Sequence, residues 1–436
     1  MSSGTPRVAI PKNGVDYRGK IVLAPMVRSG ECPSRLLALK YGADLVWGPE
    51  TIDRALIGTV RRENALTNTL DFTRFSSNGA KNPTIAPEQR ESVIYRLHPG
   101  REGRRLIYQI GTSNPETAVQ ASKLIAADVA GIDVNAGCPK PFSTLGGMGA
   151  ALLKTPDKLC SILEALVQEV GKPYEIGISV KIRILDKAED TEALVRRLCA
   201  TGITGLTVHC RTTPMRPREK AIRDQLKMVA DVCREAGVAC LMNGDVTSRD
   251  EALALIQEFG VDGAMIATAA ETNSSVFRPS SEGGRAPWEE VVKEYVKTAM
   301  EVENRWGNTK YLLGQMIPGK QPAYKAMTAT KSYSELVKAL GYEADLGEMA
   351  QDVDRRLEIG TFEKPKMSKA ERKKANKATT QQSEQTPNGS AESKTLTQAM
   401  TGAKRTADVA QLDMPLDVSR DRGPASVPEH ASTLAV

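Results

Sequence analysis

The sequence predicts an α/β protein: a (β/α)8 TIM barrel, followed by a smaller helical domain and a disordered tail. Eight short, mostly apolar runs recur over about 250 residues, stretches with helical periodicity separate most of them, and no GxGxxG follows the first run. Such runs are typical of parallel strands buried on both faces, and eight regular units favour a barrel over a doubly wound sheet. The expected strands are residues 21–26, 43–50, 105–111, 131–139, 176–184, 205–212, 238–246 and 263–268.

Each element has local support. The residues leading into the strand are similar in "DVAGIDV", "TGITGLTV" and "FGVDGAM". A glycine opens the strand in all three, and in the last two another glycine closes the preceding helix. The stretches "TPDKLCSILEALVQEVG" and "RDEALALIQEFG" show helical periodicity. The gap between the second and third strands is longer than the others. Its segment "FSSNGAKNPTIAPEQRES" predicts an excursion loop.

The pattern changes after the eighth strand. Segments such as "PWEEVVKEYVKTAMEVENRW" predict helices without strands, and no aromatic residue occurs from Glu363 to the end. A segment of that composition cannot bury enough apolar surface to fold. We therefore expect an N-terminal extension (1–20), a barrel (21–285), a helical domain (286–362) and a disordered tail (363–436).

Composition excludes several classes of protein. No run of 18 apolar residues occurs, and the N-terminus lacks the apolar segment of a secretory signal. Seven cysteines without a CxxC pair indicate free thiols in a reducing compartment, and three histidines argue against a Cys/His metal site. A net charge of +6 over 436 residues is modest, so binding to nucleic acid would need a local basic face.

Polar residues gather where the predicted strands end. In a barrel of this kind the chemistry lies at the C-terminal ends of the strands. A packed core needs none of these groups, and burying one unpaired costs about 1–3 kcal/mol. The set therefore predicts a ligand-binding barrel mouth. Its members are Pro25, Met26, Glu50, Gln109, Asn135, Cys138, Lys181, Arg183, His209, Arg211, Asn243, Gly244, Asp245, Ala267 and Thr268.

Cys138 is the strongest candidate for chemistry. A lone cysteine is more often an inert apolar residue, but here Pro139 stops the strand and the following glycines let the backbone approach a ligand. Structural alternatives stay open for three other features. Lys181 could pair with a carboxylate inside the barrel, His209 could be a hydrogen-bonded core residue, and "MNGD" could be only a turn.

Several of these motifs together resemble the tRNA-dihydrouridine synthases: "LAPM", "DVNAGCPKPFSTLGGMGAALL", "VKIRI", "VHCRT" and "MNGD". The version "GIDVNAGCPK" with "GGMGAALL", and the later "NTKYLLGQM", resemble the eukaryotic cytosolic branch that reduces the D-loop uridine at tRNA position 20. The resemblance covers residues 21–342. The Cys-Pro motif with its glycines is specific, whereas "LAPM" and "NGD" occur in several flavin barrels.

The resemblance implies FMN over the barrel mouth, NADPH as its hydride donor and tRNA as the substrate. Hydride would pass from FMN to C6 of the uracil, and Cys138, a thiol at neutral pH, would donate a proton to C5. Asn135 would touch the uracil, and Arg183 and Arg211 are further candidates for substrate contacts. The cofactor positions implied are Pro25, Met26, Val27, Gln109, Lys181, His209, Asn243, Gly244, Asp245, Ala267 and Thr268.

The sequence departs from the family in two places. The family usually has Gly-Arg or Ala-Arg after the eighth strand, where this chain has Ala267–Thr268, so one cationic contact to the FMN phosphate is lost. The double-stranded-RNA-binding domain of animal members is not expected here. Contacts to tRNA phosphates would come from the helical domain, unless its basic residues are only a solvated face. The candidates are Arg305, Lys310, Lys320, Lys325 and Lys331.

Two other functions remain open: a flavin barrel that acts on free pyrimidines, and a tRNA-binding protein that has lost its flavin. The helical appendage disfavours the first, and the complete set of strand-end residues disfavours the second. We expect a monomer without metal or membrane contact. We expect it in the cytoplasm, and also in the nucleus if the basic run "KPKMSKAERKKANK" serves for import.

Overall fold

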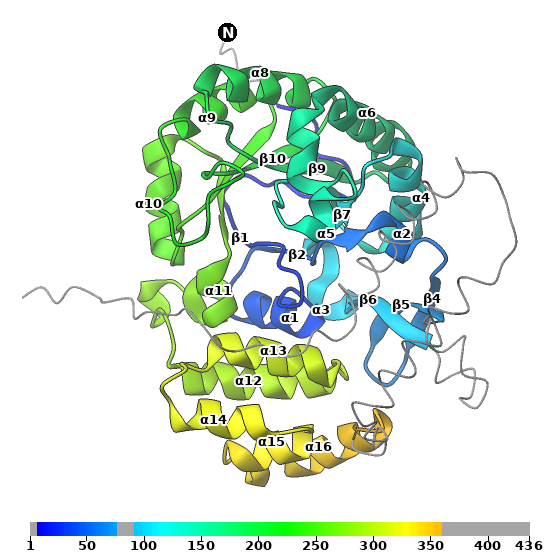
Figure 1. Cartoon of the computed structure of the whole chain (residues 1–436), viewed down its shortest axis with the longest axis vertical. Helices are drawn as coiled ribbons and strands as arrows, with labels where there is room; N and C mark the ends of the chain where they lie inside the picture. Colours follow the sequence, from blue (N-terminus) through cyan, green and yellow to red (C-terminus); the bar gives the residue numbers. More distant parts are fainter. Residues whose placement is uncertain (1–6, 76–90, 360–436) are drawn as a thin grey trace, which may run out of the picture. The chain divides into compact units, whose positions relative to one another are not determined.

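A computed structural model describes residues 7–75 and 91–359 and shows the predicted barrel (Figure 1). Within these residues eight parallel strands form one sheet, which closes because β2 pairs with both β1 and β7. The short β3 (Thr51–Ile52) adds to the end of β7. The barrel strands are β1 (Lys20–Leu23), β2 (Leu45–Trp47), β7 (Leu106–Gly111), β8 (Gly131–Ala136), β9 (Gly177–Arg183), β10 (Gly205–His209), β11 (Ala239–Asn243) and β12 (Gly263–Ile266).

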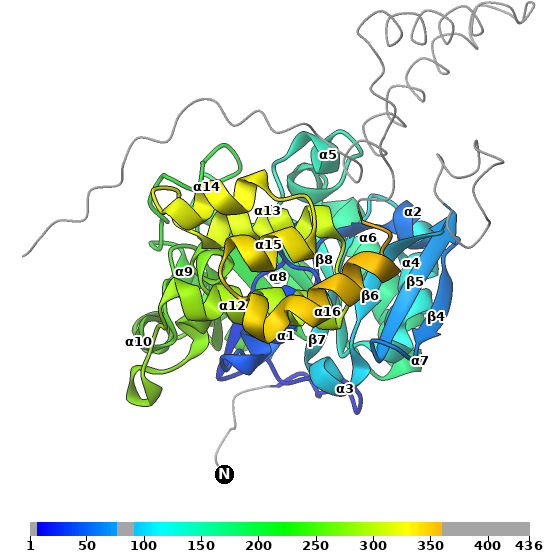
Figure 2. The same cartoon turned by 90° about the horizontal axis from the view of Figure 1, so that it is seen from below.

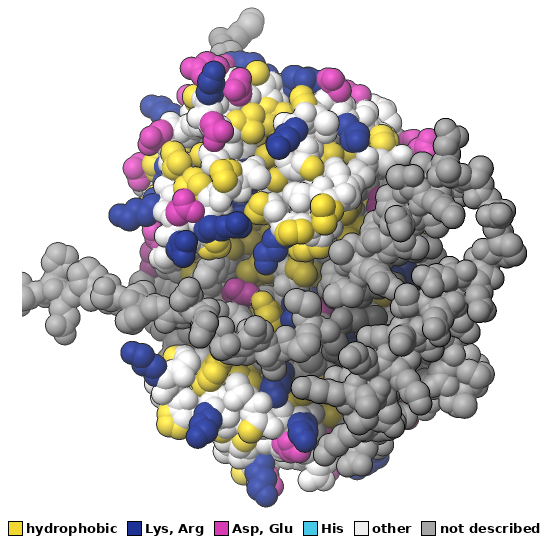
Figure 3. Space-filling model, in the orientation of Figure 1, with side chains coloured by type: hydrophobic (Ala, Val, Ile, Leu, Met, Phe, Trp, Pro, Cys, Tyr) yellow, Lys and Arg dark blue, Asp and Glu magenta, His cyan; other side chains and the backbone are white. Residues whose placement is uncertain are grey.

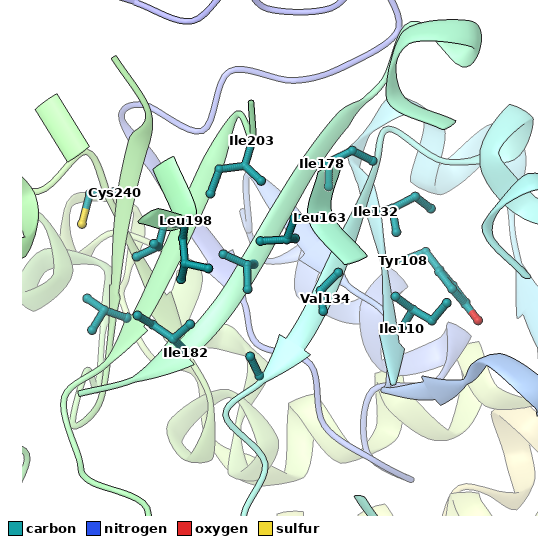
Figure 4. Close-up of a cluster of buried hydrophobic side chains, with 14 of the residues drawn as sticks. Tyr108, Ile110, Ile132, Val134, Leu163, Ile178, Ile182, Leu198, Ile203 and Cys240 are labelled. Carbon is teal, nitrogen blue, oxygen red and sulfur yellow. The ribbon is translucent and has the colours of Figure 1, made fainter. Parts of the chain in front are cut away.

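Alternate side chains of the strands enter two separate cores. In β8 and β9, Ile132, Val134, Ile178 and Ile182 point outward, where they meet helix side chains such as Leu163 (Figure 4). The intervening odd-numbered residues of these strands point into the barrel. This two-residue period places the polar strand-end residues on the inside. The helices around the barrel are α1 (Cys32–Lys40), α2 (Asp53–Leu56), α4 (Pro115–Ile125), α6 (Pro156–Leu166), α8 (Ala188–Cys199), α9 (Leu226–Glu235), α10 (Arg249–Phe259) and α11 (Thr268–Thr272).

Tyr17 closes the N-terminal end of the barrel. Its side chain is 1% exposed and its ring lies 5.8 Å from the ring of Trp47, in the inner core. A Cβ atom on Gly205 would lie 2.7 Å from the Tyr17 ring, and one on Gly131 would lie 3.1 Å from its hydroxyl. Glycines at these strand starts therefore make room for the tyrosine. The expected N-terminal extension contributes a core residue.

The excursion between β2 and β7 is more than the loop expected from the sequence. It holds an antiparallel sheet of β4 (Val60–Asn64), β5 (Thr69–Phe75) and β6 (Glu91–Leu97). Residues 76–90, most of the segment predicted as a loop, lie outside the described residues. In β5 and β6, Phe72 and Tyr95 lie in the hydrophobic core. Their neighbours along the strands are mostly polar, and in β5 even Thr69, Asp71 and Thr73 are buried. A search for fully apolar runs misses strands in which apolar and polar residues alternate.

The region after the barrel is helical, as predicted. Two residues of the barrel belong to the hydrophobic core of this region: Leu37 of α1 and Tyr41, which caps the C-terminus of α1. The helical region therefore packs directly against the barrel (Figures 1 and 2). Arg96 of β6 binds Asp71 and also donates to the carbonyl of Glu303 at 3.0 Å. No described helix could cross a bilayer. The helices are α12 (Trp288–Glu301), α13 (Trp306–Met316), α14 (Pro322–Ala329), α15 (Tyr333–Ala339) and α16 (Glu343–Arg356).

Candidate active site

The strand register brings most of the predicted residues to one end of the barrel. Asn135 of β8 is paired with Lys181 of β9, and Arg183 is paired with His209 of β10. His209 is in turn paired with Asn243 of β11. These five side chains come from residues 135 to 243 of the sequence and lie on four neighbouring strands at the mouth.

The loop after β8 holds Cys138 from both sides. The side-chain oxygen of Asn135 accepts the backbone N–H groups of Gly137 and Cys138, both at 3.0 Å. The carbonyl of Cys138 accepts the N–H of Ala150 at 2.9 Å. Gly149 has a φ of +57°, and a Cβ atom there would lie 2.6 Å from that carbonyl. The glycine run therefore lets the loop fold back onto Cys138.

Cys138 is held as a thiol. Burial raises its pKa to about 11, and the carboxyl of Glu50 acts in the same direction. Lys140 and Arg183 oppose that shift without cancelling it. The side chain is half-buried, so it is neither sealed in the core nor fully solvated. A neutral, partly accessible thiol suits a proton donor better than a nucleophile, which requires the thiolate.

Gln109 is oriented by a carboxylate inside the barrel. Its Nε2 donates to Asp133 at 2.8 Å, and its Oε1 accepts from Asn135 at 3.3 Å. Ser179 donates to the other oxygen of Asp133 at 2.7 Å. One amide hydrogen and one oxygen lone pair of Gln109 remain for a ligand. Sequence reasoning missed Asp133 and Ser179, although each precedes a candidate residue by two and so shares its face.

Lys181 is a half-buried cation that forms no ion pair with the described residues. Its Nζ donates to Asn243 at 3.0 Å, and no carboxylate of the described residues lies in ion-pair distance. Burial, with Arg183 as the second cause, lowers its pKa to about 8, and the carboxyl of Asp133 opposes this shift without cancelling it. The structural alternative for Lys181, an ion pair with a carboxylate inside the barrel, is therefore not seen among the described residues. Its unused donors fit an electron-rich ligand group at the mouth.

His209 is neutral. Burial and then the neighbouring Lys181, Arg183 and Arg211 lower its pKa to about 2. Arg211 Nη1 lies 3.3 Å from His209 Nε2. Because arginine can only donate, Nε2 is the acceptor and the ring proton is on Nδ1. His209 therefore presents an N–H donor without a charge.

Arg211 and Asp245 hold a loop together. Arg211 donates to the carbonyl of Glu219 at 2.7 Å, to that of Pro217 at 3.1 Å, and to Asp245. Asp245 also accepts the N–H of Ala221 at 2.7 Å, and these contacts lower its pKa. The proposed contacts of both residues with ligands stay predictions. In the structure, all three nitrogens of Arg211 already have protein partners.

Arg183 lies beside Cys138. Its Nε donates to the carbonyl of Gly137 at 2.8 Å and its Nη1 to that of Thr212 at 2.9 Å. It has no carboxylate partner among the described residues, and burial lowers its pKa. The guanidinium thus connects the loop after β8 with the loop after β10, and it stays positively charged next to the thiol.

The other predicted cofactor positions form the rim. Val27 is 42% exposed, while Pro25, Met26 and Ala267 are half-buried and Thr268 is exposed. Gly244 has a φ of +120°, and a Cβ atom there would lie 3.3 Å from the His209 ring. An accessible apolar rim, a glycine turn and a half-buried lysine without an ion-pair partner among the described residues fit a flat ring that carries polar edges and a phosphate.

The basic candidates of the helical domain differ from one another. Lys320, Lys325 and Lys331 are exposed. Lys310 instead donates to the carbonyls of Thr328, at 2.7 Å, and Thr330, at the end of α14. Figure 3 shows several Lys and Arg side chains on the lower part of the molecule, where Figure 1 draws α12–α16. Arg305 is exposed and points a nitrogen at the carbonyl of Val93.

Comparison with known proteins agrees with this geometry. The family model described as "Dihydrouridine synthase (Dus)" matches residues 22–358. The chain belongs to the dihydrouridine synthase family. This confirms the resemblance seen in the motifs around Cys138 and the assignment of the barrel.

Two fungal relatives match most of the chain. A Schizosaccharomyces pombe protein named tRNA-dihydrouridine(20) synthase (NAD(P)+) is 50% identical over 76% of this chain and 66% of its own length. Its Saccharomyces cerevisiae counterpart of the same name is 44% identical over 79% of this chain and 89% of its own. A Saccharomyces cerevisiae tRNA-dihydrouridine(20a/20b) synthase is 27% identical over 59% of this chain and 61% of its own length. This family member thus spans just under two thirds of the first relative.

Proposed function

We propose that this chain reduces the C5=C6 bond of a D-loop uridine in tRNA, at position 20, to dihydrouridine, with FMN and NADPH. The observation that carries the proposal is the pair formed by a half-buried Cys138 thiol and a half-buried Lys181 that forms no ion pair with the described residues, at one barrel mouth. The names of both fungal relatives support position 20 and a nicotinamide reductant.

FMN fits the residues at the mouth. Gln109 and Lys181 would meet polar edges of its ring, and Pro25 and Met26 would lie against the ring. The ribityl chain and the phosphate would be held by His209, Asn243, Gly244 and Thr268. The contacts to the phosphate would come from neutral donors and backbone N–H groups. When bound, FMN supplies the hydride, and NADPH returns the flavin to its reduced state.

Cys138 would donate the proton. The uracil carbon C5 needs a proton once C6 has been reduced, and a thiol within hydrogen-bond reach can supply it. Lys181 and Arg183 would stabilise the negative charge that develops on the uracil oxygens. This is favourable because both are shielded from solvent at least in part and neither forms an ion pair with the described residues. Asn135 keeps Cys138 in place through its two backbone hydrogen bonds.

The target uridine would have to leave its stack to reach the mouth, as other base-modifying enzymes require. The exposed Lys320, Lys325 and Lys331 would contribute phosphate contacts on the helical domain. Arg305 and Lys310 are already bound to backbone carbonyls, so we expect smaller contributions from them.

An anaerobic titration tests the proposal. The purified protein is reduced with NADPH, unmodified tRNA is added, and flavin absorbance is followed. We expect reoxidation by tRNA but not by free uridine or orotate, with dihydrouridine mapped to position 20. Reoxidation by a free pyrimidine instead would favour the small-substrate flavin barrel. A colourless protein that cannot be loaded with FMN would contradict any flavin chemistry here.

A further inference from the structure

Glu50 is a half-buried residue whose carboxyl group the reaction outlined above does not use. It follows β2, and its Oε1 accepts the hydroxyl of Ser143 at 3.0 Å. Its Oε2 is buried without a hydrogen-bond partner among the described residues. Leaving a buried oxygen unpaired costs about 1–3 kcal/mol, so its presence requires an explanation.

The surroundings hold Glu50 against the loop of Cys138. A Cβ atom on Gly111 would lie 2.6 Å from Glu50 Oε1, so a glycine at the end of β7 lets the carboxyl lie there. Ser143 belongs to α5 (Pro141–Thr144), in the loop that follows Cys138, and is fully buried. Three segments distant in sequence thus converge on one carboxyl group.

Ser143 connects this carboxyl group to the backbone of Cys138. A Cβ atom on Gly149 would clash with the Ser143 hydroxyl and lie 2.6 Å from the Cys138 carbonyl, so both lie at one point of the loop. The carboxyl group and the thiol accordingly shift each other's pKa. The groups acting on Glu50 are Ser143 and Cys138, and neither is a cation. Those acting on Cys138 are Glu50, Lys140 and Arg183. Burial without a cationic partner raises the pKa of Glu50 to about 7, so it can both hold and release a proton near neutrality.

We infer that Glu50 is a positioning residue for proton transfer, which keeps Cys138 as a thiol and returns a proton to it after each turnover. This inference rests on the proposed role of Cys138. As the S–H bond breaks, a C–H bond forms at the substrate and a thiolate remains. The O–H of Glu50 then breaks, its proton passes to sulfur, and the resulting carboxylate is reprotonated from solvent.

The test uses the full-length, flavin-loaded protein and three variants: Glu50→Gln, Glu50→Asp and Ser143→Ala. The first readout is turnover on tRNA as a function of pH. In the wild type, turnover should fall as pH rises through the pKa of Glu50. Glu50→Gln should turn over about tenfold more slowly, without that inflection, and Glu50→Asp should restore part of both. Ser143→Ala should move the inflection to higher pH, because the hydroxyl lowers the pKa of Glu50.

The second readout needs no tRNA. Alkylation of Cys138 by iodoacetamide is measured by peptide mass spectrometry, with Cys160 on the same protein as the internal control. Glu50→Gln removes a negative charge beside the thiol, so Cys138 should react about threefold faster at pH 8.5. Cys160 should be unaffected.

The outcomes separate the two proposals. If Cys138→Ala keeps full activity, the proposed mechanism fails, whatever Glu50 does. If Cys138 is essential while Glu50→Gln changes neither the pH profile nor the alkylation rate, the role of Glu50 is overturned alone. If Glu50→Gln does not fold, Ser143→Ala provides the test: a pH profile with its inflection at the wild-type pH would equally overturn the role of Glu50.

Discussion

The two ends of the barrel are built on opposite principles. At the N-terminal end, Tyr17 fills the interior against Trp47 and against strands that begin with glycine, so the space is occupied by apolar contact. At the C-terminal end, Lys181 and Glu50 are half-buried and neither forms an ion pair with the described residues. The first end stabilises the fold, whereas the second keeps charged groups where folding alone would not place them.

This difference separates stability from function within one closed sheet. The same strands, β8 to β10, run from one end to the other, so a residue's position along its strand decides which role it serves. Variants at the two ends should therefore affect different measurements, and each prediction below tests that separation.

The largest effect is expected at Cys138. Cys138→Ala should retain FMN and the melting temperature but lose about 10²–10⁴-fold in turnover on tRNA, because the proton donor is removed. Flavin content, thermal unfolding and dihydrouridine formation are compared with the wild type. Cys160→Ala, on α6, is the matched control and should behave as wild type in all three. Unchanged dihydrouridine formation by Cys138→Ala would remove this residue from the mechanism.

The opposite pattern is expected at Tyr17. Tyr17→Ala should lower the free energy of unfolding by about 3 kcal/mol, because it opens a cavity where a fully buried ring packed. Turnover per folded molecule should change little. Urea denaturation and single-turnover assays measure the two quantities, and Tyr17→Phe, which keeps the ring, should lose less than about 1 kcal/mol. A selective loss of turnover in Tyr17→Ala would show that the two ends are coupled.

The C-terminal end of the barrel was easier to predict from the sequence than the N-terminal end. The eight strands were predictable because a parallel strand buried on both faces is apolar along its length, and the mouth followed from the strand-end rule. Tyr17 could not be placed, since the stretch before β1 has no periodicity and its partners are glycines more than 100 residues away. Glu50 was visible only as a strand-end residue. Its position beside Cys138 depends on how β2 and β7 close the barrel, which no local pattern encodes.

Lys181 tests whether function limits stability at the mouth. Burial lowers its pKa from 10.5 to about 8, so the folded protein binds fewer protons than the unfolded chain between those values, and stability rises with pH there. In flavin-free protein, Lys181→Met should therefore raise the free energy of unfolding at pH 7 by about 1–3 kcal/mol. That gain should shrink as the pH approaches 10.5.

The same substitution should weaken flavin retention and turnover, because the unused donors of Lys181 are lost. Lys181→Ala should show the same functional loss, but its cavity makes it a poorer probe of stability. Unfolding curves of the flavin-free proteins and the flavin content after gel filtration measure the two effects. A less stable Lys181→Met, or one that keeps flavin and activity, would place Lys181 among structural lysines.

His209 gives the smallest and most specific effect. Its pKa is lowered from 6.5 to about 2 because it is buried and faces Lys181, Arg183 and Arg211. The unfolded chain therefore binds more protons than the folded protein below pH 6.5, so the stability that neutral His209 allows is present above that pH and is lost as the pH falls. Relative to His209→Gln, the wild type should lose about 0.5–1 kcal/mol of unfolding free energy between pH 7 and pH 6. Parallel pH dependences of the two proteins would mean that His209 titrates in the folded protein as it does in the unfolded chain, and the ring would then not be held as a neutral Nδ1–H donor at the mouth.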